Sequence, residues 1–116
     1  MKGADVNLNT DALTPQYRSK TERRFADMAM AECYAQFGVY PLAIRYEPMT
    51  FAIPGGRYTP DFELILPDRD VFVEVKGSKR QKNYRDARSK LRAAAETYPE
   101  RCWYEYRMDT QEWEAM

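Results

Sequence analysis

Residues 58–77 read YTPDFELILPDRDVFVEVKG, and their second half has the alternation of a half-buried strand. From position 71 to 76, valines alternate with Phe72, Glu74 and Lys76. Because successive side chains of a strand point to opposite faces of a sheet, the valines form one apolar face and Glu74 and Lys76 lie together on the other. The pattern predicts a β-strand with a charged pair on the face opposite the valines.

A second strand is predicted just before this one. Residues 62–66 (FELIL) alternate directly after Pro60 and Asp61. Residues 67–70 (PDRD) have the composition of a turn, so the two strands are expected to fold back side by side. Asp61 and Glu74 would then converge at one end of the strand pair.

Two carboxylates and a lysine so placed suit metal-dependent hydrolysis of a phosphodiester. Magnesium prefers hard oxygen ligands and commonly uses one or two protein carboxylates together with phosphate oxygens and waters. Asp61 and Glu74 would supply the carboxylates, and the backbone carbonyl of Val75 could complete the set. Lys76 would orient or deprotonate the attacking water, or offset charge in the transition state. The structural alternative is a turn residue at Asp61 and a solvated charge pair on an edge strand.

The same segment resembles the PD-(D/E)xK nuclease superfamily, and more closely the phage endonuclease I type of Holliday-junction resolvase. In that type a TPDF strand start and an FVExKG strand end recur, and residues 59–62 and 72–77 match them. The resemblance implies a restriction-endonuclease-like core, metal binding by Asp61 and Glu74, and a catalytic role for Lys76. It is close across the quoted segment and looser upstream.

A helix is predicted from Ser19 to about Phe37. Ser19 followed by Glu22 forms a capping box, which by itself explains both residues structurally. Glu22 also lies near the apolar face of the helix, which is marked by Phe25, Ala29 and Cys33. A carboxylate aimed at that face needs a partner, such as a metal or a bound water. In the resembled family a glutamate of the first helix joins the metal site, so Glu22 is either a further metal ligand or only a cap.

Charge is distributed unevenly along the chain. There are 18 basic and 18 acidic residues in all, but residues 75–92 hold eight basic residues and one acid, a net charge of +7 that leaves −7 elsewhere. Helical periodicity here predicts a helix from about Gln81 to Tyr98, ended by Pro99. Cations in its first turn are unfavourable unless an anion docks there. The alternative to DNA contact is a solvated helix face, and the predicted phosphate-binding residues are Lys79, Arg80, Lys82, Arg85 and Arg88.

Length and composition suit one small domain. With 116 residues, 44% of them hydrophobic, we expect a nuclease domain at 19–116 and, because residues 1–18 are polar and unpatterned, a mobile or swapped N-terminal arm. No apolar run has the length of a membrane span and no signal-peptide pattern is present, which predicts a cytoplasmic protein encoded by a phage or a bacterium. The absence of histidine excludes His-dependent triads and HExxH zinc sites. Cys33 and Cys102 are expected to be reduced thiols.

Two further strands complete the predicted architecture. Residues 41–53 alternate around a break at Pro48, and residues 101–108 are rich in aromatic side chains. The order helix, three strands, helix, strand predicts an α/β fold with a central mixed β-sheet flanked by helices. The strand aromatics are expected to be core residues rather than base-stacking platforms, namely Tyr46, Tyr58, Trp103 and Tyr104.

These patterns predict a Mg²⁺- or Mn²⁺-dependent DNA endonuclease, and the resemblance implies that it cuts branched DNA such as a Holliday junction. The alternatives are another nuclease of the same chemistry (transposon end-cleaving, restriction or mismatch type, or an exonuclease) and a catalytically degenerate DNA-binding module. Junction resolution takes two symmetric incisions, so we expect a homodimer. The arm before Ser19 and the aromatics around Trp103 and Trp113 are candidates for exchange or burial between subunits.

Overall fold

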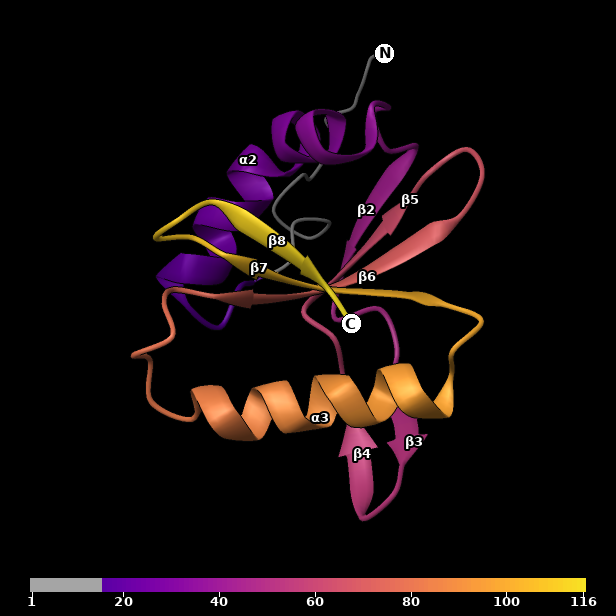
Figure 1. The fold of residues 1–116 in the computed structure, drawn as a ribbon. Coiled ribbons are helices and arrows are strands. Elements are labelled where there is room, and N and C mark those ends of the chain that lie inside the picture. Colours follow the sequence, from indigo (N-terminus) through magenta and orange to yellow (C-terminus); the bar gives the residue numbers. More distant parts are fainter. Residues whose placement is uncertain (1–15) are drawn as a thin grey trace.

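A computed structural model describes residues 16–116, and over this range the protein is an α/β fold (Figure 1). A mixed sheet of five strands runs in the order β2-β5-β6-β7-β8, and β3 and β4 form a separate hairpin. The elements in chain order are α2 (Lys20–Phe37), β2 (Ala43–Tyr46), β3 (Phe51–Ile53), β4 (Gly56–Tyr58), β5 (Phe62–Ile65), β6 (Asp70–Lys76), α3 (Tyr84–Thr97), β7 (Cys102–Arg107) and β8 (Glu112–Ala115). The predicted mixed sheet flanked by helices is confirmed.

The central strand pair forms as predicted. Strands β5 and β6 are antiparallel, with Phe62 opposite Val73 and Ile65 opposite Asp70. Strand β7 then lies parallel to β6, because helix α3 carries the chain back across the sheet between them. The charged end of β6 is therefore flanked by β7 along its whole length, whereas its ladder with β5 stops at Val73.

The stretch 41–53, predicted as a strand in which Pro48 marks a bulge, an edge or a break, is broken there into two strands of different sheets. After β2 the chain turns at Glu47, which has a left-handed φ of 46°, and Pro48 follows. Strand β3 then pairs with β4, and Gly55 takes up a φ of 83° in the turn between them. The terminal strand β8, antiparallel to β7, was also not predicted. The apolar positions shift from 42, 44 and 46 before Pro48 to 49, 51 and 53 after it, and this change of phase, together with the proline, is the sequence signal that separates β2 from β3.

Helix α2 covers one face of the sheet (Figure 1). Ser19 caps its N-terminus, and it ends at Gly38, whose φ of 77° is readily adopted by glycine. The valines of β6 point to this helix, as the alternation predicted. The fully buried residues that join helix and sheet are Phe25, Ala29, Cys33, Phe62, Leu64, Val71, Val73 and Tyr106.

Helix α3 and the β3–β4 hairpin cover the opposite face (Figure 1). Phe72 and Trp103 stack there with ring centroids 4.9 Å apart, and Phe51, Leu91 and Ala94 are buried around them. The expectation that Trp103 lies at a subunit interface is wrong, because only 2% of it is exposed. Trp113 is half-buried against the core under α2, and so are Tyr46 and Tyr104. Tyr58 and Trp103 are buried in the core under α3. The predicted core role of these strand aromatics is confirmed.

Helix α3 begins at Tyr84 rather than at the predicted Gln81. Asn83 has a left-handed φ of 66°, which the helix cannot include, and the Gln81 side chain accepts a hydrogen bond from the Gly77 N–H at 2.7 Å. These features shape a loop from 77 to 83. The prediction that several cations lie in the first turn of the helix holds for Arg85 alone among the five predicted contacts, since Lys79, Arg80 and Lys82 belong to the loop and Arg88 follows the first turn.

Most of the predicted arm, residues 1–15 of 1–18, lies outside the described residues. Its last residues pack on the domain. The Tyr17 ring meets that of Tyr46 edge-on, with centroids 4.7 Å apart, and Arg18 forms an ion pair with Glu47 at 3.0 Å. The chain entering α2 is thus anchored to the end of β2.

Two smaller expectations also meet the structure. Cys33 and Cys102 are free thiols, as predicted, and burial raises the pKa of the Cys33 thiol above its ordinary value. Within residues 16–116, neither helix has the length and apolar character needed to cross a membrane.

Candidate metal centre and nucleic-acid interface

Asp61 stands between Pro60 and the first residue of β5 and is 9% exposed. Its Oδ2 accepts a hydrogen bond from the Val75 N–H at 2.8 Å, just beyond the point where the β5–β6 ladder ends. In a strand the N–H and C=O of one residue point to the same edge, so the Val75 carbonyl is directed to the Asp61 side. The predicted convergence of Asp61 with the end of β6 is confirmed.

Glu74 and Lys76 form a buried pair on the face predicted for the site. The Glu74 Oε2 lies 3.1 Å from the Lys76 Nζ, and the two side chains are 8% and 11% exposed. The other carboxylate oxygen, Oε1, accepts a hydrogen bond from the Tyr58 hydroxyl at 2.5 Å. The alternative of a solvated pair on an edge strand is excluded, because β6 is a central strand and both side chains are buried.

The electrostatics of the two carboxylates are unfavourable in the absence of a cation. Burial raises the pKa of Asp61 well above its ordinary value, and the nearby charge of Glu74 raises it further. Burial also raises the pKa of Glu74, and Lys76 opposes that effect. One ammonium group thus faces two buried carboxylates, so the cluster has an excess negative charge when both are ionised.

The donor set fits a hard divalent cation. Asp61, Glu74 and the Val75 carbonyl are all oxygen donors, which Mg²⁺ and Mn²⁺ accept and which soft metals avoid. Within the described residues, no three Asp, Glu, Cys or His side chains lie close enough to hold a metal by themselves. Asp61, Glu74 and Glu22 therefore do not form a three-carboxylate site as they stand, and a cation here would also need the Val75 carbonyl, waters and phosphate oxygens.

Glu22 serves the helix and faces the site at once. Its backbone N–H donates to the Ser19 Oγ at 3.2 Å, which confirms the predicted N-cap. Its side chain does not complete the capping box but accepts a hydrogen bond from the Tyr46 hydroxyl at 2.5 Å. From there the Glu22 carboxylate lines the same pocket as Asp61.

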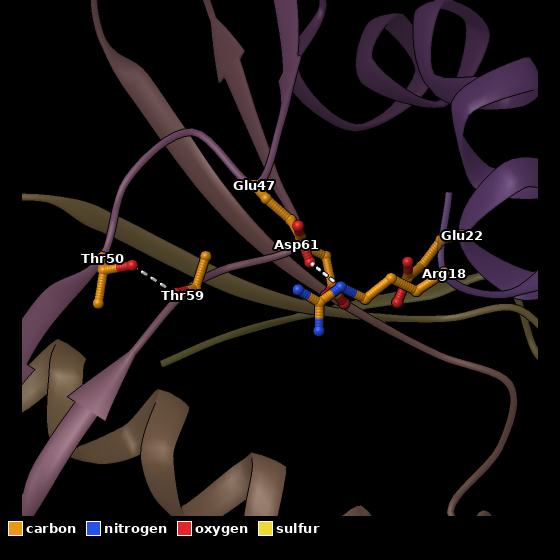
Figure 2. A pocket seen from close by; sticks show the side chains of 6 residues that line it. All are labelled: Arg18, Glu22, Glu47, Thr50, Thr59 and Asp61. Atoms are coloured by element: carbon orange, nitrogen blue, oxygen red, sulfur yellow. Dashed lines mark hydrogen bonds and ion pairs between the residues drawn. The ribbon is translucent and has the colours of Figure 1, made fainter. Parts of the chain in front are cut away.

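That pocket, of about 450 Å³, opens at the end of the sheet beside the N-terminus of α2 (Figure 2). Figure 2 shows the Arg18 side chain reaching toward Glu47 and Asp61, with Thr50 and Thr59 on the hairpin side. The two threonine hydroxyls are 2.6 Å apart. The sequence interpretation assigned no role to four of the lining residues, of which only Thr59 belongs to a quoted motif: Arg18, Glu47, Thr50 and Thr59.

The loop that follows Lys76 carries exposed cations. Lys79, Arg80 and Lys82 are exposed, and so is Arg85 in the first turn of α3. None of these four forms an ion pair within residues 16–116. The loop begins beside α2, because a Cβ on Gly77 would lie 3.8 Å from the Thr21 Oγ1. The exposed cations therefore lie in the chain segment that directly follows the end of β6, where Glu74 and Lys76 are placed.

Arg88, the fifth predicted DNA contact, is engaged inside the protein. Its guanidinium pairs with Glu105 at 3.0 Å and with Glu114 at 2.6 Å, and it is 22% exposed. Arg107 pairs with the same two carboxylates. These hydrogen bonds raise the pKa of Arg88 above its ordinary value and hold that of Glu114 down at about 2. Arg88 is accordingly left out of the DNA surface proposed below.

Comparison with protein-family models, with curated proteins and with solved structures gave no match to this chain.

Proposed function

We propose that the protein is a Mg²⁺- or Mn²⁺-dependent DNA endonuclease with a restriction-endonuclease-like core. The observation that carries the proposal is the burial of Asp61 and Glu74 beside a single lysine, Lys76, at the end of β6. Such a cluster lacks one positive charge, and its oxygen donors suit a hard cation. The pocket lined by Asp61 and Glu22 gives a phosphate access, and the exposed cations of the next loop supply a surface for a polyanion.

The roles of the side chains follow from their positions. Asp61, Glu74 and the Val75 carbonyl would hold the metal, with Glu22 as an additional ligand from across the pocket. The bound metal would polarise the scissile phosphate and lower the pKa of a water. The Val75 N–H fixes one oxygen of Asp61 and so leaves the other directed away from the strand. Lys76 would exchange its contact with Glu74 for the phosphate or the attacking water, where its ammonium offsets developing negative charge.

DNA is the proposed substrate because the cations outside the site form a continuous run. Lys79, Arg80, Lys82 and Arg85 would contact backbone phosphates, which gives affinity without base specificity. The preference for branched DNA rests on the resemblance of residues 58–77 to endonuclease I type resolvases. With one Asp61-Glu74-Lys76 set per chain, two symmetric incisions require two copies of the chain, so the proposed working form is a homodimer.

Cleavage assays on three substrates test the function. The purified chain is incubated with linear duplex, single-stranded DNA and a four-way junction of matched length, with Mg²⁺, with Mn²⁺ or with chelator. Paired symmetric nicks in the junction, dependent on metal and absent in Asp61→Asn prepared identically, are expected. Cleavage of linear duplex at an equal rate would instead support another nuclease of the same chemistry.

Light scattering at micromolar concentration, with and without the junction, tests the dimer. A dimer in either condition is expected. A monomer in both conditions, together with single nicks on any duplex, would rule out the resolvase assignment and leave a general nuclease.

One observation favours a second function, a DNA-binding module without catalysis. Both oxygens of Glu74 already have protein partners, Tyr58 and Lys76, so the cluster is more satisfied than an open metal site needs to be. Metal-independent junction binding, with no cleavage and no heat of Mg²⁺ binding in calorimetry, would establish this alternative.

A further inference from the structure

Tyr58 lies three residues before Asp61 and donates its hydroxyl to Glu74 at 2.5 Å, yet no catalytic motif includes it. It is the last residue of β4 and belongs to the hairpin rather than to the central sheet. Its side chain therefore reaches the candidate metal ligand from outside the sheet that carries that ligand. Only 5% of Tyr58 is exposed.

The Tyr58 ring is held by the core of the α3 face. It lies 6.4 Å from the Trp103 ring, and its strand partner Phe51 packs edge-on against Trp103 at 5.0 Å. The hairpin is further tied to the end of α3, because the Tyr98 hydroxyl donates to the Ala52 carbonyl at 2.7 Å. A phenol fixed in this way can impose a position on the group it contacts.

The two partners of the Glu74 carboxylate differ in mobility. Lys76 carries its ammonium on a flexible stem of four carbons, and the proposed reaction requires it at the phosphate or the water. Tyr58 has no such stem, and its ring is packed on all sides. When Lys76 leaves, the Tyr58 hydroxyl remains as the donor that fixes the orientation of Glu74.

We infer that Tyr58 is a positioning residue for metal binding: its hydroxyl holds Oε1 of Glu74 so that the carboxylate faces Asp61. The inference rests on the proposed function. Without the hydroxyl, Lys76 remains the partner of Glu74 on Oε2 while Oε1 loses its donor, so the carboxylate is no longer held in one orientation for a metal. Partners that orient metal ligands typically contribute about 10- to 100-fold in metal affinity.

The test compares two variants that each remove one tyrosine hydroxyl whose hydrogen bond ties the β3–β4 hairpin to a neighbouring element. Tyr58→Phe removes the contact to Glu74, whereas Tyr98→Phe removes the hairpin anchor to Ala52 and touches no carboxylate. Each metal-free full-length protein is titrated calorimetrically with MgCl₂ and with MnCl₂, without DNA, at a temperature below its unfolding transition. Tyr58→Phe should bind either metal about 10- to 100-fold more weakly than wild type, and Tyr98→Phe within about twofold of it.

Cleavage gives a second readout that a general packing defect would not reproduce. In Tyr58→Phe the Mg²⁺ concentration for half-maximal cleavage should rise by the same factor, while the rate at saturating Mg²⁺ stays within about threefold of wild type. A double-variant cycle with Glu74→Asp tests the contact itself, because the shorter side chain keeps the carboxylate but withdraws it from the hydroxyl. Glu74→Asp should then lose metal affinity, and adding Tyr58→Phe to it should cost nothing more.

The outcomes separate the two proposals. Unchanged metal affinity in Tyr58→Phe, with metal bound by wild type, would overturn the role of Tyr58 and leave the nuclease proposal standing. An additive loss in the double variant would likewise overturn it. Absence of Mg²⁺ and Mn²⁺ binding by wild type would overturn both.

Discussion

Two charged clusters lie side by side on the α3 face, one on β7 and one on β6. The parallel register sets Glu105 opposite Glu74 and Arg107 opposite Lys76, so the two strands repeat the same acid-x-base pattern. The β7 cluster gains a second arginine, Arg88 from α3, and a second glutamate from β8. The β6 cluster gains only another acid, Asp61.

The difference lies in charge balance. In the β7 cluster Glu105 is fully buried, but it accepts from Arg88, from Arg107 and from the Tyr84 hydroxyl. Every buried charge there has an opposite charge beside it, which is the arrangement of a structural ion network. In the β6 cluster one lysine serves two buried acids. The β7 cluster is balanced by its own side chains, whereas in the β6 cluster a proton on Asp61 or, under the proposed function, a metal ion offsets the second carboxylate.

The largest expected effect is on catalysis at the unbalanced cluster. Asp61→Asn and Glu74→Gln should each lower the metal-dependent cleavage rate by on the order of 10³-fold or more, because a metal ion contributes several kcal/mol to the transition state. Junction affinity in chelator should be unchanged, since the loop cations remain. Quantitative gel assays of both properties check this. Glu63→Gln, which changes a buried carboxylate of β5 two residues after Asp61, is the matched control and should cleave at nearly the wild-type rate.

Substitutions in the β7 cluster should change the stability of the fold. Glu105→Ala leaves Arg88 and Arg107 without their shared buried partner and should lower the free energy of unfolding by about 3–5 kcal/mol. Urea denaturation in chelator measures it. Glu112→Ala, which removes an exposed carboxylate 3.4 Å from Arg107, is the control and should cost less than about 1 kcal/mol. Equal losses in the two variants would show that the network has no special role in the fold.

The sequence predicted the β6 cluster better than the β7 cluster for a physical reason. Val71 to Lys76 alternate without interruption, and a motif marks Asp61, so local pattern was sufficient to bring three side chains together. The ion network joins α3, β7 and β8. Which residues of these elements meet depends on how the α3 crossover places β7 beside β6, and sequence periodicity does not determine that placement. Arg88 was therefore assigned to DNA. Tyr58 was missed because its contact crosses from the hairpin to the sheet, and local alternation does not show which part of the sheet the hairpin packs on.

The exposed loop cations, which form no ion pair within residues 16–116, should contribute to DNA binding, whereas an arginine already paired with a carboxylate should not. Replacing Lys79, Arg80 and Lys82 together with alanine should reduce the slope of log affinity against log salt by about two to three units, about one for each lost phosphate contact. Affinity measured by fluorescence anisotropy over a salt series in chelator checks this. Arg69→Ala, at the turn on the opposite end of β6, should leave the slope unchanged. An unaltered slope in the triple variant would assign the loop to a solvated surface.

The smallest expected effect is a gain in stability at the metal site. The pKa of Asp61 is raised in the folded protein, so the folded state holds its proton more tightly than the unfolded state does. Stability from this group is present below the unfolded pKa of about 4 and is lost as pH rises toward the folded value. Asn at position 61 carries no charge and keeps an oxygen to accept the Val75 N–H. Asp61→Asn should therefore be more stable than wild type at pH 8 in chelator, by about 0.5–2 kcal/mol as single stabilising substitutions commonly are, and by much less at pH 4. Saturating Mg²⁺ should narrow the gap at pH 8 by stabilising wild type alone. Denaturation curves at the two pH values, with and without Mg²⁺, measure this, and a wild type more stable than Asp61→Asn in chelator at pH 8 would contradict an excess of negative charge in the cluster.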